Sequence, residues 1–83
     1  MDRVEQIVRT FLGEYVLEPE QVDALDRKAH LIKLGILNSL TLTRLVACLE
    51  SEMDTKIDPS EFEIEHFETI EAICNFMNDK LSR

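Results

Sequence analysis

The 83-residue sequence is short enough for one domain with a small core, and two glycines, two prolines and few aromatic residues favour a helical bundle over a turn-rich sheet. The 17 acidic and 9 basic side chains give a net charge of −8. This charge repels nucleic acid and anionic membrane surfaces, and it favours partners with basic surfaces.

The first part of the chain predicts one amphipathic helix followed by a long loop. Apolar residues between Val4 and Val16 recur every three or four positions, which predicts a helix over residues 2–16. Asp2 is a candidate cap, and Glu5 follows it at capping-box spacing. From residue 17 to 37 the periodicity fades, so we expect a loop with one or two helical turns near residues 19–25. Its apolar anchors would be Val22, Leu25, Leu31, Ile32 and Leu34, and Gly35 suits a tight backbone turn.

The second long helix is predicted to begin at Asn38 or Ser39 and to end near Glu52. Its buried face would carry Leu42, Leu45, Val46, Leu49 and Met53. A short polar residue at a helix start most often caps the unpaired N–H groups. The alternative for Ser39 is that its hydroxyl is displayed there for attachment of a phosphate-containing group, which the helix dipole would favour by about 0.3–1 kcal/mol. The mixed outer face is a candidate contact surface for partners and includes Leu40, Thr41, Arg44 and Ala47.

The last third predicts a short helix and then a final long one. Asp58-Pro59-Ser60-Glu61 is typical of a helix start, with Phe62 and Ile64 as apolar contributors and Phe67 as an anchor after them. Thr69 would cap a last helix whose buried positions are Ile70, Ile73, Met77 and Leu81. The predicted fold is therefore all-α, a small four-helix bundle with three long helices and one short one, formed by a single domain over residues 1–83.

The sequence offers no catalytic or metal-binding constellation. Cys48 and Cys74 lack metal-ligand spacing and are expected to be free thiols, and His30 and His66 are expected to be solvated. The spacing of Asp54, Lys56 and Asp58 hints at a calcium loop, but the required Gly and Glu are missing, so we expect no metal site.

Two further expectations concern surface and location. The acids Glu61, Glu63, Glu65 and Glu68 could form a solvated face or meet a basic partner, and the sequence does not decide between these. The N-terminus lacks the features of a signal peptide, and no apolar stretch is long enough to cross a membrane, which favours a cytoplasmic location.

The order of these elements resembles the acyl carrier and peptidyl carrier protein family. The centre of the resemblance is Leu34-Gly35-Ile36-Leu37-Asn38-Ser39-Leu40, which is similar to the family's pattern of Gly, a few apolar residues and Asp-Ser-Leu. Further support comes from residues 45–53, from Ile57-Asp58-Pro59 and from residues 67–73. The resemblance covers nearly the whole chain.

This resemblance implies a carrier rather than an enzyme. Ser39 would bear 4′-phosphopantetheine, transferred from coenzyme A by a phosphopantetheinyl transferase that brings its own Mg²⁺. The arm would hold an acyl or aminoacyl group as a thioester. The implied partners are that transferase, a loading enzyme, and downstream synthase or tailoring enzymes, with the carrier itself a monomer.

Two departures from the family pattern bear on the pathway. Asn38 stands where the family usually has Asp, which keeps the cap but removes a charge that transferases engage. Thr41 and Arg44 stand where fatty-acid carriers usually have acids, and Thr43-Arg44-Leu45-Val46 is more similar to the peptidyl carrier branch. We therefore expect a stand-alone carrier of a specialised polyketide or nonribosomal peptide type of pathway. The alternative is an unmodified helical interaction module derived from a carrier.

Overall fold

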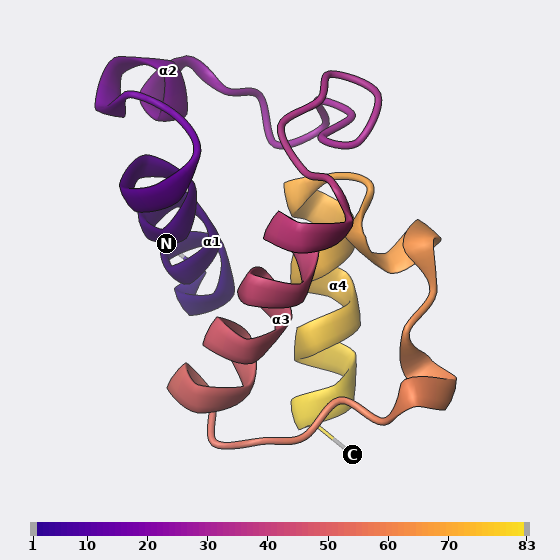
Figure 1. Ribbon diagram of the computed structural model, residues 1–83. Coiled ribbons are helices and arrows are strands. Elements are labelled where there is room, and N and C mark those ends of the chain that lie inside the picture. The colour runs from indigo at the N-terminus through magenta and orange to yellow at the C-terminus, as the bar shows by residue number, and fades with distance from the viewer. Residues whose placement is uncertain (1, 83) are drawn as a thin grey trace.

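The computed structural model describes residues 2–82, in which every regular element is helical and no strand occurs. In chain order the elements are α1 (Arg3–Tyr15), α2 (Pro19–Ala24), α3 (Ser39–Glu52), two single 3₁₀ turns η1 (Pro59–Glu61) and η2 (Ile64–Phe67), and α4 (Ile70–Leu81). Helices α1 and α3 run antiparallel, and α4 packs behind them (Figure 1). Within this described range, no helix is long and apolar enough to cross a membrane. The all-helical fold predicted from the sequence is confirmed.

Helix α1 forms where the apolar periodicity predicted it. Asp2 caps its start by accepting the Val4 N–H at 2.8 Å, and five apolar side chains on one face are buried. Glu5 does not close a capping box as its spacing suggested. Its carboxylate lies 2.9 Å from Arg9 Nε and 3.4 Å from Arg27 Nε, so it joins α1 to the long loop instead.

The loop between α1 and α3 is held down by a few buried side chains and backbone hydrogen bonds. Leu31 is fully buried, and its N–H donates to the Glu68 carbonyl just before α4 at 2.7 Å. The predicted helical turns form α2, where the Gln21 side chain accepts the Glu18 N–H at 2.8 Å. Leu34, predicted to be an anchor, is 63% exposed instead. Gly35 makes the expected turn with φ +76°, a left-handed conformation that a Cβ would strain.

The segment before α4 differs from the single short helix predicted there. Asp58 and Glu61 form the predicted capping box, but Pro59 is followed by only one 3₁₀ turn before the chain bends into a second one. Of the two apolar contributors expected here, Phe62 is 40% exposed and stacks on Phe67 with a centroid distance of 5.4 Å, whereas Ile64 is 58% exposed. Phe67 is fully buried, as predicted.

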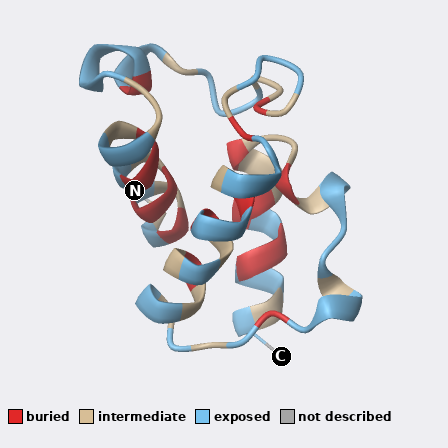
Figure 2. Cartoon of the chain, viewed as in Figure 1, coloured by how far each residue is buried: buried red, intermediate tan, exposed pale blue. Residues whose placement is uncertain are grey.

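The core lies between α1, α3 and α4, where the buried residues of the three long helices face one another (Figure 2). Thr69 caps α4 by accepting the Ala72 N–H at 2.9 Å, and Ile70, Ile73 and Met77 are buried as predicted. Leu81, also predicted to be buried, is 40% exposed because the last turn of α4 extends past the core. Both cysteines are free thiols, as expected.

The two glycines offer a matched test of the backbone. Gly35→Ala should destabilise the protein by about 1–2 kcal/mol, because nothing crowds the new Cβ and only the left-handed conformation is strained. Gly13→Ala should stabilise it by about 0.5–1 kcal/mol, because Gly13 lies within α1 and its Cβ would meet Val22 Cγ2 at an ordinary 3.6 Å. Urea unfolding measures both changes, and equal effects of the two substitutions would contradict this account.

Asp2 should contribute stability that depends on pH. Partial burial alone would raise its pKa, but hydrogen bonds from Asn78 at 2.7 Å and from the Val4 N–H outweigh it and lower the pKa below its ordinary value of 3.8. A lowered folded pKa gives stability that is present above pH 3.8 and is lost as the pH falls through the folded pKa.

We therefore expect Asp2→Ala to cost about 1 kcal/mol of unfolding free energy at pH 7. The gap from the unsubstituted protein should narrow as the pH falls below 3.8. Urea unfolding as a function of pH measures this difference. Asp23→Ala, which removes the same charge from an exposed position on α2, is the control for the loss of one negative charge.

Candidate functional site

The start of α3 is held by a side-chain cap on Asn38. Its Oδ1 accepts the N–H groups of Leu40 and Thr41, both at 3.0 Å. In return, the Thr41 hydroxyl accepts the Asn38 N–H at 2.8 Å, which completes a capping box. The Asn-x-x-Thr spacing is the sequence signal for this capping box. Sequence reasoning placed Thr41 on the partner surface and did not predict its part in the cap. In the structure its hydroxyl serves the cap.

Ser39 is the first residue of α3 and is exposed. Its carbonyl accepts a hydrogen bond from the Thr43 hydroxyl at 2.8 Å. Within residues 2–82, no group forms a hydrogen bond with the Ser39 hydroxyl itself. Asn38 thus performs the capping that either residue could have performed, and the Ser39 hydroxyl is left to solvent.

The loop that precedes Ser39 is fixed by buried leucine side chains and by backbone hydrogen bonds within the loop. Leu37 is 1% exposed, and the N–H groups of Ile36 and Leu37 both donate to the Leu31 carbonyl, at 2.9 and 3.1 Å. Leu31 is in turn bound to the backbone next to α4. This arrangement places Ser39 at a defined position above the core, with the 63% exposed Leu40 beside it.

The predicted contact residues separate into two groups along α3. Asn38 and Leu40 lie with Ser39 at the helix start, whereas Arg44 and Ala47 line a groove of about 670 Å³ between α1 and α3. The opposite wall of this groove includes Tyr15 of α1, which is 61% exposed. Sequence reasoning placed Tyr15 on the apolar face of α1 and gave no signal that it would be exposed.

The first turn of α3 carries no acidic residue, so no carboxylate of that turn opposes the approach of an anion to the helix start. The positive end of the helix dipole favours an anion there, although the N–H groups of Leu40 and Thr41 are already bonded to Asn38. The site therefore combines an accessible hydroxyl with a weakly anion-favouring backbone.

The acidic segment after α3 is more structured than a merely solvated face. Glu61 accepts hydrogen bonds from Lys80 Nζ at 2.7 Å and from the Asp58 N–H at 3.0 Å. Glu63 and Glu68 lie 3.9 and 3.7 Å from ring nitrogens of histidines. Of the four acids Glu61, Glu63, Glu65 and Glu68, two thus lie beside imidazole rings, and Glu61 is bonded to a lysine.

Neither histidine is the fully solvated residue that we expected. His66 is half-buried and stacks on Phe76 with a centroid distance of 4.4 Å. His30 is also half-buried, and its Nδ1 accepts the Lys33 N–H at 3.1 Å. Both rings therefore have structural contacts.

The thiols are poorly suited to nucleophilic chemistry. Burial raises the pKa of Cys48, and the carboxylates of Glu52 and Glu14 raise it further. Burial also raises the pKa of Cys74, which is 1% exposed. Both sulfurs are thus held as the less reactive protonated thiol. Among residues 2–82 no group of His, Cys, Asp or Glu side chains is arranged to hold a metal ion.

The donor set at the start of α3 fits a phosphate ester of serine. An ester needs a hydroxyl that solvent and a partner can reach, and the Ser39 hydroxyl meets that condition. The capped helix start supplies a backbone that tolerates the added negative charge.

Comparisons with known proteins agree with this geometry. The sequence matches the family described as "Phosphopantetheine attachment site" over residues 2–77. The fold is similar to the solution structure of a holo acyl carrier protein from Nitrosomonas europaea, with 26% identity, a TM-score of 0.82 and full coverage of both chains. A search of curated proteins found no match. The chain therefore belongs to the phosphopantetheine-attachment family: it is a carrier protein of the acyl carrier type rather than an enzyme, and its cofactor is covalently bound phosphopantetheine.

Proposed function

We propose that Ser39 is the residue to which phosphopantetheine is attached, and that residues 1–83 act as a single stand-alone carrier domain. The observation that supports this best is the division of roles at the start of α3. Asn38 takes the N–H groups of Leu40 and Thr41, so the exposed Ser39 hydroxyl is not needed for the fold.

Attachment requires little from this chain beyond access and position. The Ser39 hydroxyl gives its proton to a base of the transferase, and its oxygen forms one new bond to phosphorus as the nucleotide part of coenzyme A departs. Once bound, the phosphopantetheine supplies a terminal thiol that can hold an acyl or aminoacyl group as a thioester. The positive end of the α3 dipole favours the negative charge beside Ser39, by about 0.3–1 kcal/mol.

The surface around Ser39 favours enzymes of a specialised polyketide or nonribosomal peptide type of pathway. The first turn of α3 lacks acids, Leu40 is 63% exposed, and Arg44 and Ala47 are exposed further along the helix. The transferase, the loading enzyme and the downstream enzymes would therefore meet a first half of α3 that is neutral to basic and partly apolar. Of the residues assigned to this contact, Asn38 and Thr41 would act mainly by fixing the helix start.

The attachment site can be tested by intact mass. Treatment with a broad-specificity phosphopantetheinyl transferase and coenzyme A should add the mass of one phosphopantetheine to the protein. Ser39→Ala should abolish the gain, because the acceptor oxygen is absent. Ser51→Ala, which removes another exposed hydroxyl from α3, should retain it.

Modification that persists in Ser39→Ala would disprove the assignment. No gain in any variant would favour the unmodified interaction module, in which the absence of a charge at Asn38 prevents transfer.

The role of Asn38 can be tested separately by restoring a carboxylate. Asn38→Asp should speed transfer to Ser39 severalfold, up to about tenfold, because a charge at the rim of an interface mainly accelerates association. The cap should survive, since Asp and Asn serve equally well at this position. The initial rate of mass gain measures the effect, and circular dichroism checks the helix content. Equal rates would show that the charge is unimportant in this protein.

A further inference from the structure

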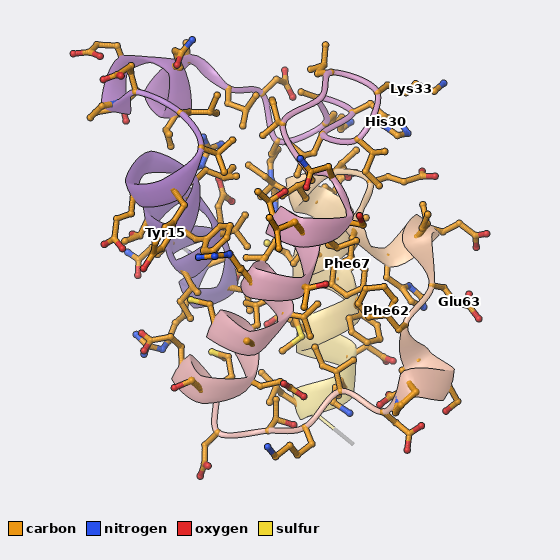
Figure 3. The ribbon with its side chains drawn as sticks, viewed as in Figure 1. Tyr15, His30, Lys33, Phe62, Glu63 and Phe67 are labelled. Carbon is orange, nitrogen blue, oxygen red and sulfur yellow. The ribbon has the colours of Figure 1, made fainter. Side chains whose placement is uncertain are left out.

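The groove between α1 and α3 is an open surface feature that the attachment chemistry does not use. It has a volume of about 670 Å³, and its apolar lining includes Ile7, Phe11, Ala47 and Cys48. Tyr15 lies at one end, with 61% of its surface exposed and its ring centroid 5.1 Å from that of Phe11 (Figure 3). A partly apolar groove flanked by an exposed aromatic ring is typical of a surface that another protein covers.

Four charged side chains line this groove, and their signs alternate. Because α1 and α3 are antiparallel, Glu14 of α1 and Arg44 of α3 lie toward the end where α3 begins. Arg3 of α1 and Glu52 of α3 lie toward the other end. Within residues 2–82 none of the four forms an ion pair. Each of the two helices thus carries one positive and one negative charge along the groove, and at each end of the groove the charge on α1 is opposite to the charge on α3.

We propose that this groove binds a second copy of the chain in a weak, reversible dimer with twofold symmetry. If the twofold axis runs along the helices, α1 of one copy lies over α3 of the other, and Glu14 meets Arg44 while Arg3 meets Glu52. If the axis lies across the helices, Glu14 meets Arg3 and Arg44 meets Glu52. Both arrangements pair only opposite charges, so the face is complementary to itself.

Overall charge also favours this face over the rest of the surface. Two chains with a net charge of −8 repel each other, but the four charges of the groove sum to zero. The acids are concentrated elsewhere: residues 58–69, between α3 and α4, contain five acids and no Lys or Arg, and this segment lies on the far side of α3 from α1 (Figure 1). At physiological salt the repulsion from charges beyond about 8 Å is largely screened.

The same features make the dimer weak. Tyr15 and Ala47 are its exposed apolar contacts, and exposed ion pairs contribute little each. Dilute protein therefore remains the monomer expected from the sequence, and pairing occurs in concentrated solution. Pairing does not involve the Ser39 hydroxyl, so this proposal can fail while the attachment site stands, and the reverse is also true.

Sedimentation equilibrium over a concentration series up to about 1 mM tests the pairing. The average mass of the unsubstituted protein should rise with concentration. Arg44→Glu should lower the association constant at least about tenfold, because it places like charges together twice in each dimer. Lys33→Glu makes the same change in net charge on the loop, away from Tyr15 (Figure 3), and should leave association nearly unchanged. Circular dichroism confirms that each variant is folded.

Mixing complementary variants identifies the arrangement. Glu14→Arg and Glu52→Arg should each weaken self-association. A mixture of Arg44→Glu with Glu14→Arg should regain dimers if the axis runs along the helices, and a mixture with Glu52→Arg should do so if it runs across them. The proposal is overturned if the unsubstituted protein stays monomeric throughout, if Arg44→Glu behaves like Lys33→Glu, or if neither mixture regains dimers. In the first case the groove remains open to a different protein.

Discussion

The site depends on the hydrogen bonds that Asn38 makes to the first turn of α3. A helix start leaves several N–H groups without partners, and a single side-chain oxygen satisfies two of them here, at Leu40 and Thr41. The Thr41 hydroxyl returns a bond to the Asn38 N–H, so the chain direction into the helix is fixed from both sides. The next side chain, Ser39, is therefore exposed at a well-defined position without contributing its hydroxyl to the fold.

The long loop supports this position from a distance. Its backbone is tied to the start of α4 through Leu31, which is buried and accepts two N–H groups from the residues just before Asn38. Arg9 and Arg27 hold other parts of the same region, through the Val22 carbonyl and the Glu5 carboxylate. A loop of about 14 residues between α2 and α3 can thus be ordered by two buried leucines, Leu31 and Leu37, and a few hydrogen bonds.

Charge is distributed unevenly over the surface, and this affects how the carrier meets other proteins. The acids gather after α3, where Glu61 and Glu68 are already engaged by Lys80 and His30. The face of α3 that begins at Ser39 is nearly free of acids and continues into the α1–α3 groove. Surfaces of different chemistry therefore lie on different sides of a small bundle, and each can be altered without changing the other.

The sequence by itself determined the helical class, the limits of α1, α3 and α4, and the family, because these follow from local signals. Apolar residues recur at helical spacing over long stretches, and Asp2, Asn38, Asp58 and Thr69 lie at helix starts where short polar side chains can cap. The position of Ser39 followed from the same signals together with the family pattern.

Only the tertiary structure decided which apolar residues of the irregular segments are buried. Leu31 and Leu34 look alike in the sequence, yet Leu31, whose N–H donates to the Glu68 carbonyl beside α4, is fully buried, whereas Leu34 is 63% exposed. Two short 3₁₀ turns replaced the expected helix, and there Phe62 covers the buried Phe67 while Ile64 remains 58% exposed. The pairing of α1 with α3 likewise created the groove beside Tyr15, which no local pattern could show because its walls come from residues about 30 to 50 positions apart.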